Sequence, residues 1–430
     1  MATHNYNRRE FLNASARNAA GAAVGALGLG LSAHAGEPER IRVGIVGAGN
    51  RGQELALLFA QQPGAVVTSL CDVDIRHAAL LQDELRKTTG ARPVVVPDHE
   101  ALLSRSDVDA VVIATPDHWH ARIAVDACQA GKDIYLEQPV ALSIHQGDQI
   151  AAAARQSGSL IQTGLPQRSG AHFQSAVNAV QSGAIGDVRF AKAWAVHQRR
   201  PLSHQESSTP PPGVDYDRWL GPAENRPFQP ARFHQNWQWF WDYGAGELGC
   251  WGVQYLDVVR WGLNLDLPSR ISASGGCLYL QDQRETPDTL TVQYEFDDVQ
   301  VLWEHRQWSS HGIEGRTAGA AFYGSDGTLV IDRSGWKVYG GRQPLFEGAS
   351  EIRSAHVANF LNSVRTRQSP AADIETGHRS MTLCHLGNIS YRLGRALKFD
   401  AQSNSFVSDD EANNLLTGNA LAPGNVTEAT

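Results

Sequence analysis

Residues 43–52 read VGIVGAGNRG, and this stretch decides the fold of the first half of the chain. A β-branched run leads to the pattern Gly47-x-Gly49-x-x-Gly52, and an apolar helical segment follows. In such a strand–turn–helix, the first glycine makes a tight turn, the second lets the backbone approach a pyrophosphate, and the third lets helix and strand pack closely. The helix N-terminus then offers unpaired N–H groups to phosphate charge. The stretch therefore predicts a dinucleotide-binding turn.

An acidic residue at the right distance specifies the nucleotide. The second β run ends at Asp72, about twenty residues after Gly52. An acid there accepts hydrogen bonds from ribose hydroxyls and repels a 2′-phosphate, which favours NAD over NADP. Asp74 is a second possible acceptor. The sequence therefore predicts NAD as the cofactor.

The surrounding pattern predicts the fold class of this half. Between Ile41 and Thr163, five apolar β runs alternate with helical patterns; the runs cover residues 41–47, 66–72, 109–116, 133–139 and 159–164. Continuous apolar strands alternating with helices indicate a parallel sheet covered on both faces. We expect an α/β, doubly wound Rossmann domain over residues 40–165, with its ligands beyond the carboxyl ends of the strands.

The pattern changes after Gly164. A helix and a long strand precede a Pro-rich insertion over residues 200–235, and another helical stretch, residues 247–263, is followed by six β runs with Gly and Asp turns. This order predicts a second, C-terminal α+β domain over residues 166–400 with an open, largely antiparallel sheet. The polar segment 401–430 is expected to be a loose tail.

The N-terminus predicts export. Residues 7–12 read NRREFL, an Ala/Gly/Leu-rich run extends to Leu31, and Ala33-His34-Ala35 forms an A-x-A cleavage pattern. This order is typical of a twin-arginine signal peptide over residues 1–35, although an ordinary disordered N-terminus is the alternative. That route carries folded proteins, so a cofactor captured in the cytoplasm could travel with its protein. We therefore expect a periplasmic protein.

Bulk properties narrow the partners. The formal net charge is -8 and the pI is near 6.0, which gives no reason to expect nucleic acid or another polyanion. No apolar run after residue 36 reaches the roughly 20 residues that span a bilayer, so we expect no membrane insertion after signal removal. The five cysteines are far apart and form no C-x-x-C, which argues against a disulfide scaffold.

Three stretches supply candidate pocket residues. The run ending in Thr115-Pro116 continues as DHWH to His120, the next run ends in Glu137-Gln138-Pro139, and GELGCWGVQYLD places Cys250, Gln254 and Asp257 on one helical face. The first two stretches lie at carboxyl ends of strands, where a nicotinamide would sit. The predicted cofactor-binding residues are Gly47, Gly49, Asn50, Arg51, Gly52, Asp72, Thr115, Pro116, His120, Glu137 and Gln138.

Together VGIVGAGNRG, CDVD, ATPDHWH, EQP, YDRWLGP, NWQWFWDYGAGELG and GHRSMTLCHLGNISYRLGR resemble the glucose–fructose oxidoreductase / inositol dehydrogenase (Gfo/Idh/MocA) family, in the branch common among exported bacterial members. The resemblance extends from Ile41 to about Asp400. It implies redox chemistry on sugars, inositols or related polyols; some members resemble glycosidases that oxidise a sugar transiently, cleave it and return the hydride. It also implies a homo-oligomer.

The chain departs from the family at two positions. The resemblance implies Lys where Gln138 stands and His where Gln254 stands, and these residues act in proton transfer. A carboxamide has no pKa near neutrality, so Gln138 and Gln254 can orient a hydroxyl but cannot take its proton. Three alternatives follow: proton transfer has moved to a neighbouring residue, the protein binds NAD and a sugar without turnover, or the reaction of the reduced cofactor with an activated substrate needs little proton transfer. The candidate bases are His120, His234, Asp242, Tyr243 and Tyr255, of which Asp242 and Tyr255 join the two glutamines as predicted catalytic residues.

An aromatic cluster points to a carbohydrate ligand. Five of the eleven tryptophans lie between Trp219 and Trp251, and sugar C–H faces stack on aromatic planes, although core packing explains any single tryptophan equally well. His118-x-His120 lacks the partners of a metal motif, so no metal is expected. The predicted substrate contacts are Arg168, His234, Asn236, Trp237 and Trp241. The predicted function is a periplasmic, NAD-dependent oxidoreductase acting on a sugar or glycoside with a tightly bound, internally recycled cofactor; a non-catalytic NAD- and carbohydrate-binding protein is the alternative.

Overall fold

The computed structural model describes residues 40–341 and 345–418. The predicted signal peptide and the segment after residue 418 lie outside the described residues. Within the described ranges, no helix combines the length and the apolar character that crossing a membrane requires.

The first half of the chain forms a six-stranded parallel sheet in the order β3-β2-β1-β4-β5-β6. This order confirms the predicted doubly wound fold, and the apolar runs of β4 and β5 are buried along their whole length because helices cover both faces. The edge strand β3 was not predicted. The strands are β1 (Ile41–Val46), β2 (Ala65–Cys71), β3 (Val94–Val96), β4 (Ala110–Ile113), β5 (Asp133–Leu136) and β6 (Ile161–Thr163).

The helices of this half begin and end at residues that suit their caps. Ser143 accepts a hydrogen bond from the Gln146 amide at the start of α6, and Gly158 ends α6 in the left-handed conformation that glycine tolerates. Asp74 caps α3 in the same way. The helices are α2 (Asn50–Ala60), α3 (Ile75–Thr89), α4 (His99–Leu103), α5 (Asp117–Gln129) and α6 (Ile144–Ser157).

The second half forms a ten-stranded sheet in the order β14-β13-β12-β11-β7-β10-β9-β8-β15-β16. The pairing of β7 with β10 is parallel and the other pairings are antiparallel, which confirms the predicted open, largely antiparallel sheet. Its strands are β7 (Val188–Val196), β8 (Arg270–Gly276), β9 (Thr289–Glu295), β10 (Gln300–Arg306), β11 (Ala318–Gly324), β12 (Thr328–Asp332), β13 (Gly335–Tyr339), β14 (Phe346–Gly348), β15 (Leu397–Asp400) and β16 (Ser405–Phe406).

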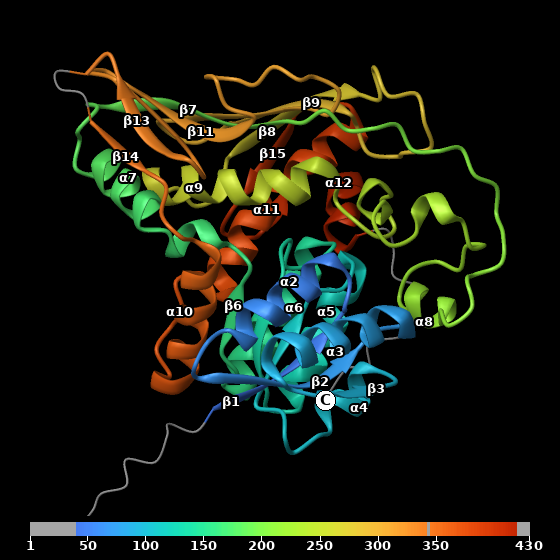
Figure 1. The fold of residues 1–430 in the computed structure, drawn as a ribbon. Coiled ribbons are helices and arrows are strands. Elements are labelled where there is room, and N and C mark those ends of the chain that lie inside the picture. Colours follow the sequence, from blue (N-terminus) through green and yellow to red (C-terminus); the bar gives the residue numbers. More distant parts are fainter. Residues whose placement is uncertain (1–39, 342–344, 419–430) are drawn as a thin grey trace, which may run out of the picture. The chain divides into compact units, whose positions relative to one another are not determined.

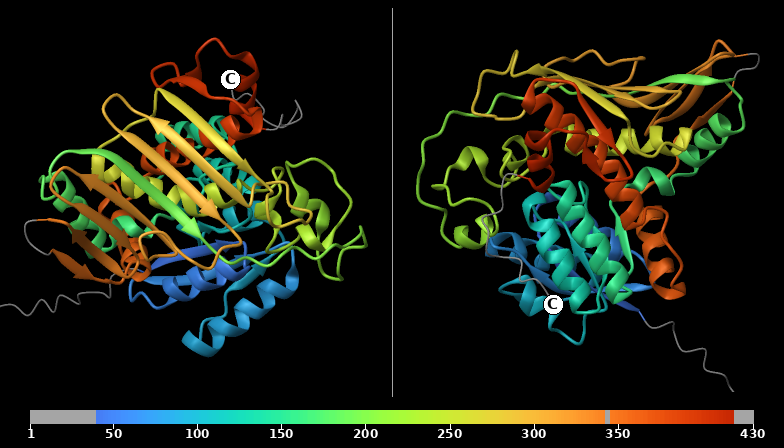
Figure 2. Two further views of the ribbon diagram at one scale, coloured as in Figure 1. Left: turned by 90° about the horizontal axis from the view of Figure 1, so that it is seen from above. Right: turned by 180° about the vertical axis from the view of Figure 1, so that it is seen from behind.

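Helices cover one face of this sheet, and the view from above shows the other face bare of helices (Figures 1 and 2). Helix α9 packs on β7 and β11, and α11 packs on β8. The helices of this half are α7 (Ala171–Gln181), α8 (Tyr216–Leu220), α9 (Val253–Leu263), α10 (Arg353–Thr366), α11 (Ile374–Leu393) and α12 (Asp410–Asn414), with the 3-10 turns η1 (Pro166–Ser169), η2 (Pro230–Arg232), η3 (Trp237–Trp239) and η5 (Leu415–Thr417) and the π-helical turn η4 (Leu248–Gly252).

A late segment of the chain returns to the first sheet. The Phe360 ring of α10 packs edge-on against Phe59 and Tyr135, with ring centroids 5.8 Å away in both cases. All three side chains are buried in the core that the first sheet shares with α2 and α10. Sequentially distant elements therefore fix the base of the nucleotide-binding half.

The segment after Ala401 differs from the expected loose tail. Residues 405–417 contain β16, α12 and η5, and Asn413 exchanges two hydrogen bonds with the backbone of Phe406. Phe406 and Ala412 are buried in the main core. Apolar residues at these few positions outweigh the polar composition on which the expectation rested.

Candidate active site

The turn between β1 and α2 has the conformation that its glycines permit. Gly47 has φ of +90°, which side chains rarely tolerate, and a Cβ at Gly52 would lie 1.8 Å from the Gly47 oxygen. A Cβ at Gly49, in contrast, would meet nothing within 4 Å. Two glycines are thus required by the protein itself, whereas Gly49 leaves open space in front of the α2 N-terminus.

That open space belongs to a cavity of about 1040 Å³. One wall consists of the predicted nucleotide-binding residues Gly47, Gly49, Asn50, Arg51, Asp72, Thr115 and Pro116. The Thr115 hydroxyl is buried and lacks a hydrogen-bond partner among the described residues. A buried orphan hydroxyl is costly, so this atom calls for a ligand partner. The free space at Gly49 and the unsatisfied Thr115 both fit a bound dinucleotide.

Asp72 connects the two strands beside this space. Its carboxylate accepts hydrogen bonds from the amides of Ala48, at 2.6 Å, and Asp74, at 2.8 Å. A carboxylate has about four lone-pair sites, so two remain for ribose hydroxyls. Asp72 therefore holds the glycine turn in place and faces the cavity as the sequence predicts.

The other wall comes from residues 200–238, which we call the cover segment. Ser208, Phe228, Phe233 and Trp237 of this segment line the cavity. Backbone hydrogen bonds attach the segment to the Rossmann half: the Asp215 amide donates to the Val73 oxygen at 2.8 Å. The cover segment thus closes over the nucleotide crevice from the opposite side.

Contacts of two adjacent α8 residues, Arg218 and Trp219, strengthen this attachment. Arg218 forms an ion pair with Asp98 at 2.7 Å. The Trp219 oxygen lies 2.9 Å from the His118 ring nitrogen and accepts a hydrogen bond from the Trp119 indole at 3.0 Å. These contacts involve the loops after β2 and β3 and the first turn of α5, so the part of the cover segment around α8 is held at three places on the first half of the chain.

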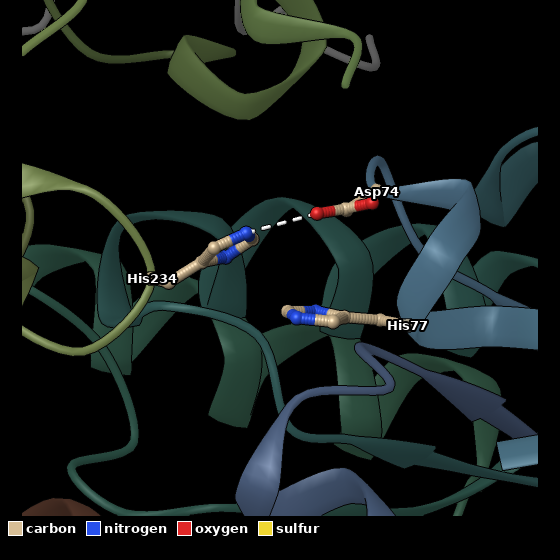
Figure 3. A group of neighbouring side chains, drawn as sticks. All are labelled: Asp74, His77 and His234. Atoms are coloured by element: carbon tan, nitrogen blue, oxygen red, sulfur yellow. Dashed lines mark hydrogen bonds and ion pairs between the residues drawn. The ribbon is translucent and has the colours of Figure 1, made fainter. Parts of the chain in front are cut away.

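A histidine clasp closes the cover segment onto the ribose side of the cavity (Figure 3). His234 lies 3.0 Å from the Asp74 carboxylate, and the His77 ring lies 4.3 Å from the His234 ring. His234 has φ of +56°, a strained conformation for a non-glycine residue that the contact with Asp74 holds. Burial, followed by the neighbouring His77, lowers the pKa of His234. Arg76 donates to both Asp74 oxygens, so this carboxylate already has a cation partner.

The two predicted glutamines meet at one backbone carbonyl. The Cys250 oxygen accepts hydrogen bonds from the Gln138 amide nitrogen at 3.1 Å and from the Gln254 amide nitrogen at 3.2 Å. Gln138 follows β5 and Gln254 lies on α9, so the contact connects the two halves of the chain. Neither glutamine is among the residues that line the cavity, and the same holds for the predicted nucleotide contacts Gly52 and Glu137. The Gln138 oxygen is buried without a partner among the described residues.

Known proteins place the chain in a family. The sequence model described as "Oxidoreductase family, NAD-binding Rossmann fold" matches residues 41–165, and the one described as "Oxidoreductase family, C-terminal alpha/beta domain" matches residues 189–329 and 342–425. These matches cover more than half of the chain. The chain belongs to the Gfo/Idh/MocA family. The predicted family, its NAD cofactor and its enzymatic class are thereby confirmed.

Curated relatives match part of the chain. An alpha-N-acetylgalactosaminidase of Shewanella oneidensis is 27% identical over 232 residues, which are 48% of this chain and 50% of that protein. A glycosyl hydrolase family 109 protein of Saccharopolyspora erythraea is 29% identical over 221 residues, which are 46% of this chain and 47% of that protein. The chain thus spans about half the length of the curated relatives it matches.

Solved structures share the fold. The aldose-aldose oxidoreductase from Caulobacter crescentus, complexed with glycerol, aligns with a TM-score of 0.65 at 18% identity, over 84% of this chain and 100% of that one. The WlbA dehydrogenase from Bordetella pertussis, in complex with NADH and UDP-GlcNAcA, aligns with a TM-score of 0.64 at 18% identity, over 84% of this chain and 99% of that one. At these identities the likeness concerns the fold.

In this Gfo/Idh/MocA protein, the candidate bases have other partners. Both ring nitrogens of buried His120 lie within 2.9 Å of backbone oxygens, those of Pro139 and Thr115, so it braces two loops and does not line the cavity. Asp242 pairs with Arg226 at 2.6 Å. Burial raises the pKa of Tyr243 to about 12 and that of Tyr255 further still. Burial lowers the pKa of His120, and the two tyrosines stay protonated at neutral pH, so none of these three side chains is suited to accept a substrate proton there.

The remaining predicted residues separate into two groups. The first group, Asn236, Trp237 and His234, lines the cavity. His234 lies near the end of β2, whereas Gln138 follows β5, and the strands β1 and β4 lie between β2 and β5 in the sheet. The second group contacts other side chains. Arg168 donates two hydrogen bonds, of 2.8 and 2.9 Å, to the Asp257 carboxylate, and the Arg392 guanidinium lies over the Trp241 ring. The structure thus places Arg168 and Trp241 in internal contacts.

Glu137 and Cys250 have defined roles. Glu137 is buried and pairs with Arg51 at 2.8 Å, which fixes the loop after β5 to the glycine turn. Burial raises the pKa of the Cys250 thiol to about 12, so it is not a nucleophile, and its contribution is the backbone oxygen that receives the glutamines.

Sequence reasoning missed two features of the site. One is the enclosure of the cavity by the cover segment. This segment is rich in proline and shows no helical or strand periodicity, so its position could not be predicted. The other is Arg333, which donates a 2.6 Å hydrogen bond to the Gln254 oxygen from the turn between β12 and β13. A lone arginine in a turn has no local pattern that would single it out.

Proposed function

We propose that this protein is an exported oxidoreductase that retains its NAD and acts on a sugar or glycoside in a redox-neutral cycle. The observation that carries the proposal is the cavity at the glycine turn, with its second wall supplied by the cover segment of the same chain. A nucleotide held between these walls leaves slowly, because its release requires the clasp and the α8 contacts to open. The NRREFL stretch and its apolar run support export with the cofactor already in place.

The chain's residues perform the binding part of such a cycle. The α2 N-terminus and Gly49 receive the pyrophosphate, and Asp72 receives the ribose hydroxyls. Glu137 and Arg51 hold the two loops at the nicotinamide end together. NAD supplies the hydride acceptor and, at the end of the cycle, the hydride donor. Gln138 and Gln254 orient a substrate hydroxyl through hydrogen bonds, since neither amide titrates.

Retention of the hydride is required by the proposed location. Outside the cytoplasm no free nicotinamide pool re-oxidises the cofactor, so each hydride returns to the same sugar or to a second one. Sugar-to-sugar oxidoreduction and glycoside cleavage through a transient ketone both satisfy this condition. The names of the curated relatives support the glycoside alternative. We expect a homo-oligomer, as the family resemblance implies.

A direct test measures the cofactor. The full-length protein is purified from the periplasm without added nucleotide, denatured, and assayed for released NAD(H) by chromatography. We expect about one equivalent per chain, and less than about a tenth of an equivalent contradicts retention. Accumulation of the protein in the cytoplasm alone contradicts export.

A second function competes with the first. The replacement of both proton-handling positions by amides favours a protein that binds NAD and a carbohydrate without turnover. Incubation of the nucleotide-loaded protein with sugars and aryl glycosides separates the two. Thermal stabilisation by a ligand, without reduced nicotinamide or released product, supports the binding function.

A further inference from the structure

Arg333 lies at the glutamine pair although it comes from a distant part of the chain. It occupies the turn between β12 and β13, and its guanidinium donates to the Gln254 oxygen at 2.6 Å. The same guanidinium lies over the Trp251 ring, 5.0 Å from the centroid. Gln254 in turn shares the Cys250 oxygen with Gln138. Arg333 therefore contacts the proposed reaction site, and the residue as a whole is partly exposed.

The positive charge of Arg333 is not neutralised. Among residues 40–341 and 345–418, no carboxylate lies within ion-pair distance of Arg333. The adjacent carboxylate, Asp332, pairs with Arg316 instead. Its Nε–H group is buried without an acceptor in the same part of the chain. Burial lowers the pKa of Arg333, which shows that its charge is partly desolvated. A desolvated charge without a counter-ion is costly and is explained by a ligand of opposite charge.

The nearby charges strengthen this conclusion. Arg353, Arg51 and Glu54 also act on Arg333 electrostatically: the two arginines lower its pKa, and Glu54 raises it. Both arginines pair with Glu54, and Arg51 pairs with Glu137 as well. Two carboxylates thus balance two guanidinium groups, and the charge of Arg333 is left over. One surplus positive charge matches a carboxylate, which carries one negative charge, better than a phosphomonoester, which carries about −1.5 to −2.

We infer that Arg333 binds a carboxylate of the substrate, so that the sugar taken by this site is a uronic acid or a glycoside of one. Guanidinium and carboxylate form charge-assisted hydrogen bonds that are stronger than those to a neutral hydroxyl. The contact with Gln254 then brings the carboxylated ring next to the two amides. This inference rests on the proposed function, because it assigns the substrate class of the same site.

The test compares acids with their neutral counterparts. Nucleotide-loaded, full-length protein is titrated by calorimetry with glucuronate against glucose and galacturonate against galactose, at one ionic strength. We expect each acid to bind about tenfold to a hundredfold more tightly than its neutral sugar. Arg333→Met should reduce that ratio to about one, and Arg333→Lys, which keeps the charge without the planar fork, should give an intermediate ratio.

A matched control removes a different arginine. Arg365 is an exposed residue of α10 that donates to the Gly64 oxygen, and Arg365→Met should keep the full preference for acids. Equal or tighter binding of the neutral sugars, a preference that survives in Arg333→Met, or no binding of either acid overturns the inference. Tighter binding of glucose 6-phosphate than of glucuronate overturns the choice of a carboxylate. If Arg333→Met does not fold, Arg333→Lys and the wild-type ratios still decide.

Nucleotide content separates this inference from the proposed function. The same protein sample is denatured after titration and its NAD(H) is measured. Full nucleotide content without a preference for acids removes only the inference about Arg333. Absence of nucleotide removes the proposed function and, with it, the inference.

Discussion

The two ends of the site differ in what they can do. At the nucleotide end, Gly49 leaves space for a pyrophosphate, Asp72 retains free acceptor sites, and the cover segment closes the cavity. At the reaction end, Gln138 and Gln254 converge on the Cys250 oxygen, and neither side chain carries a titratable proton. We therefore expect binding and proton transfer to be separable in this protein, so that each can be altered without the other.

The largest effect is expected from restoring titratable groups at the reaction end. Gln138→Lys with Gln254→His places two such groups at the Cys250 oxygen, where each can still donate a hydrogen bond. Since a positioned acid or base contributes about 10²–10⁴-fold to a rate, we expect sugar-dependent reduction of bound NAD to rise by about that factor. The absorbance of reduced nicotinamide, followed in a single turnover with a panel of sugars and uronates, measures it.

The two single variants are the controls for this experiment. Each should give less activity than the double variant, because proton transfer then lacks one partner. If the double variant instead loses an activity that the wild type has, the amides themselves serve the reaction, and the separation of the two ends is wrong.

The next effect concerns the nucleotide end. Gly49→Ala adds a methyl group where the protein itself leaves room but where a pyrophosphate would approach the backbone. We expect nucleotide content to fall at least about tenfold, while the apoprotein melts at the wild-type temperature. Chromatography of released NAD(H) and circular dichroism check both parts.

Gly52→Ala provides the contrast. Its Cβ would lie 1.8 Å from the Gly47 oxygen, so this variant should lose thermal stability whether or not nucleotide is present. A Gly49→Ala protein that keeps one equivalent of NAD(H) would place the pyrophosphate elsewhere and break the assignment of this end.

A smaller effect is expected at the clasp. Asp74→Asn keeps the cap of α3 but removes the charge that pairs with Arg76 and His234. Breaking such a buried contact costs about 1–3 kcal/mol, so we expect the free energy of unfolding at pH 7 to fall by that amount and NAD release to accelerate. Urea denaturation and a nucleotide release assay measure the two effects. The control is Asp83→Asn, an exposed carboxylate on the same helix, which should leave NAD release unchanged.

The same carboxylate predicts a pH dependence. Burial acts to raise the pKa of Asp74, but the hydrogen bonds from Arg76 and His234 outweigh it and lower the pKa to about 2. In an unfolded chain the pKa of an aspartate is about 3.9. Between these values the unfolded state binds more protons, so stability falls as the pH drops from about 4 to about 2. As the pH drops through this window, the free energy of unfolding should decrease less steeply for Asp74→Asn than for the wild type. An equal slope for the two proteins would contradict the role of the clasp.

The nucleotide end could be predicted from the sequence because its determinants are local. The glycine turn from Gly47 to Gly52 directly follows β1, and Asp72 directly follows β2. The apolar runs of β1 and β2 identify both as buried strands. Strand β3 was missed because it has three residues, lies at the sheet edge and is partly exposed. Helix α3 was missed because its apolar contacts, Leu81 and Leu85 among them, are few in a polar segment.

The reaction end could be predicted only in part. The sequence located Gln138 and Gln254, because one follows a strand and the other lies on an apolar helix. Their common partner, the Cys250 oxygen, and the approach of Arg333 depend on how α9 packs on the second sheet, which no local pattern encodes. The clasp depends in the same way on the path of the Pro-rich cover segment, which has no periodicity to read.

The smallest effect tests whether a tyrosine has replaced the missing base. Tyr255 is 1% exposed, its ring stacks near Trp251, and burial raises the pKa of its hydroxyl well above neutrality. Removing a true base would cost about 10²–10⁴-fold, so Tyr255→Phe in the Gln138→Lys, Gln254→His background should change the single-turnover rate by less than about threefold. The pH profile of that rate should also keep its shape, because a phenol that stays protonated contributes no limb. A hundredfold loss, or loss of the basic limb, would instead make Tyr255 the proton carrier and give the reaction end a titratable group of its own.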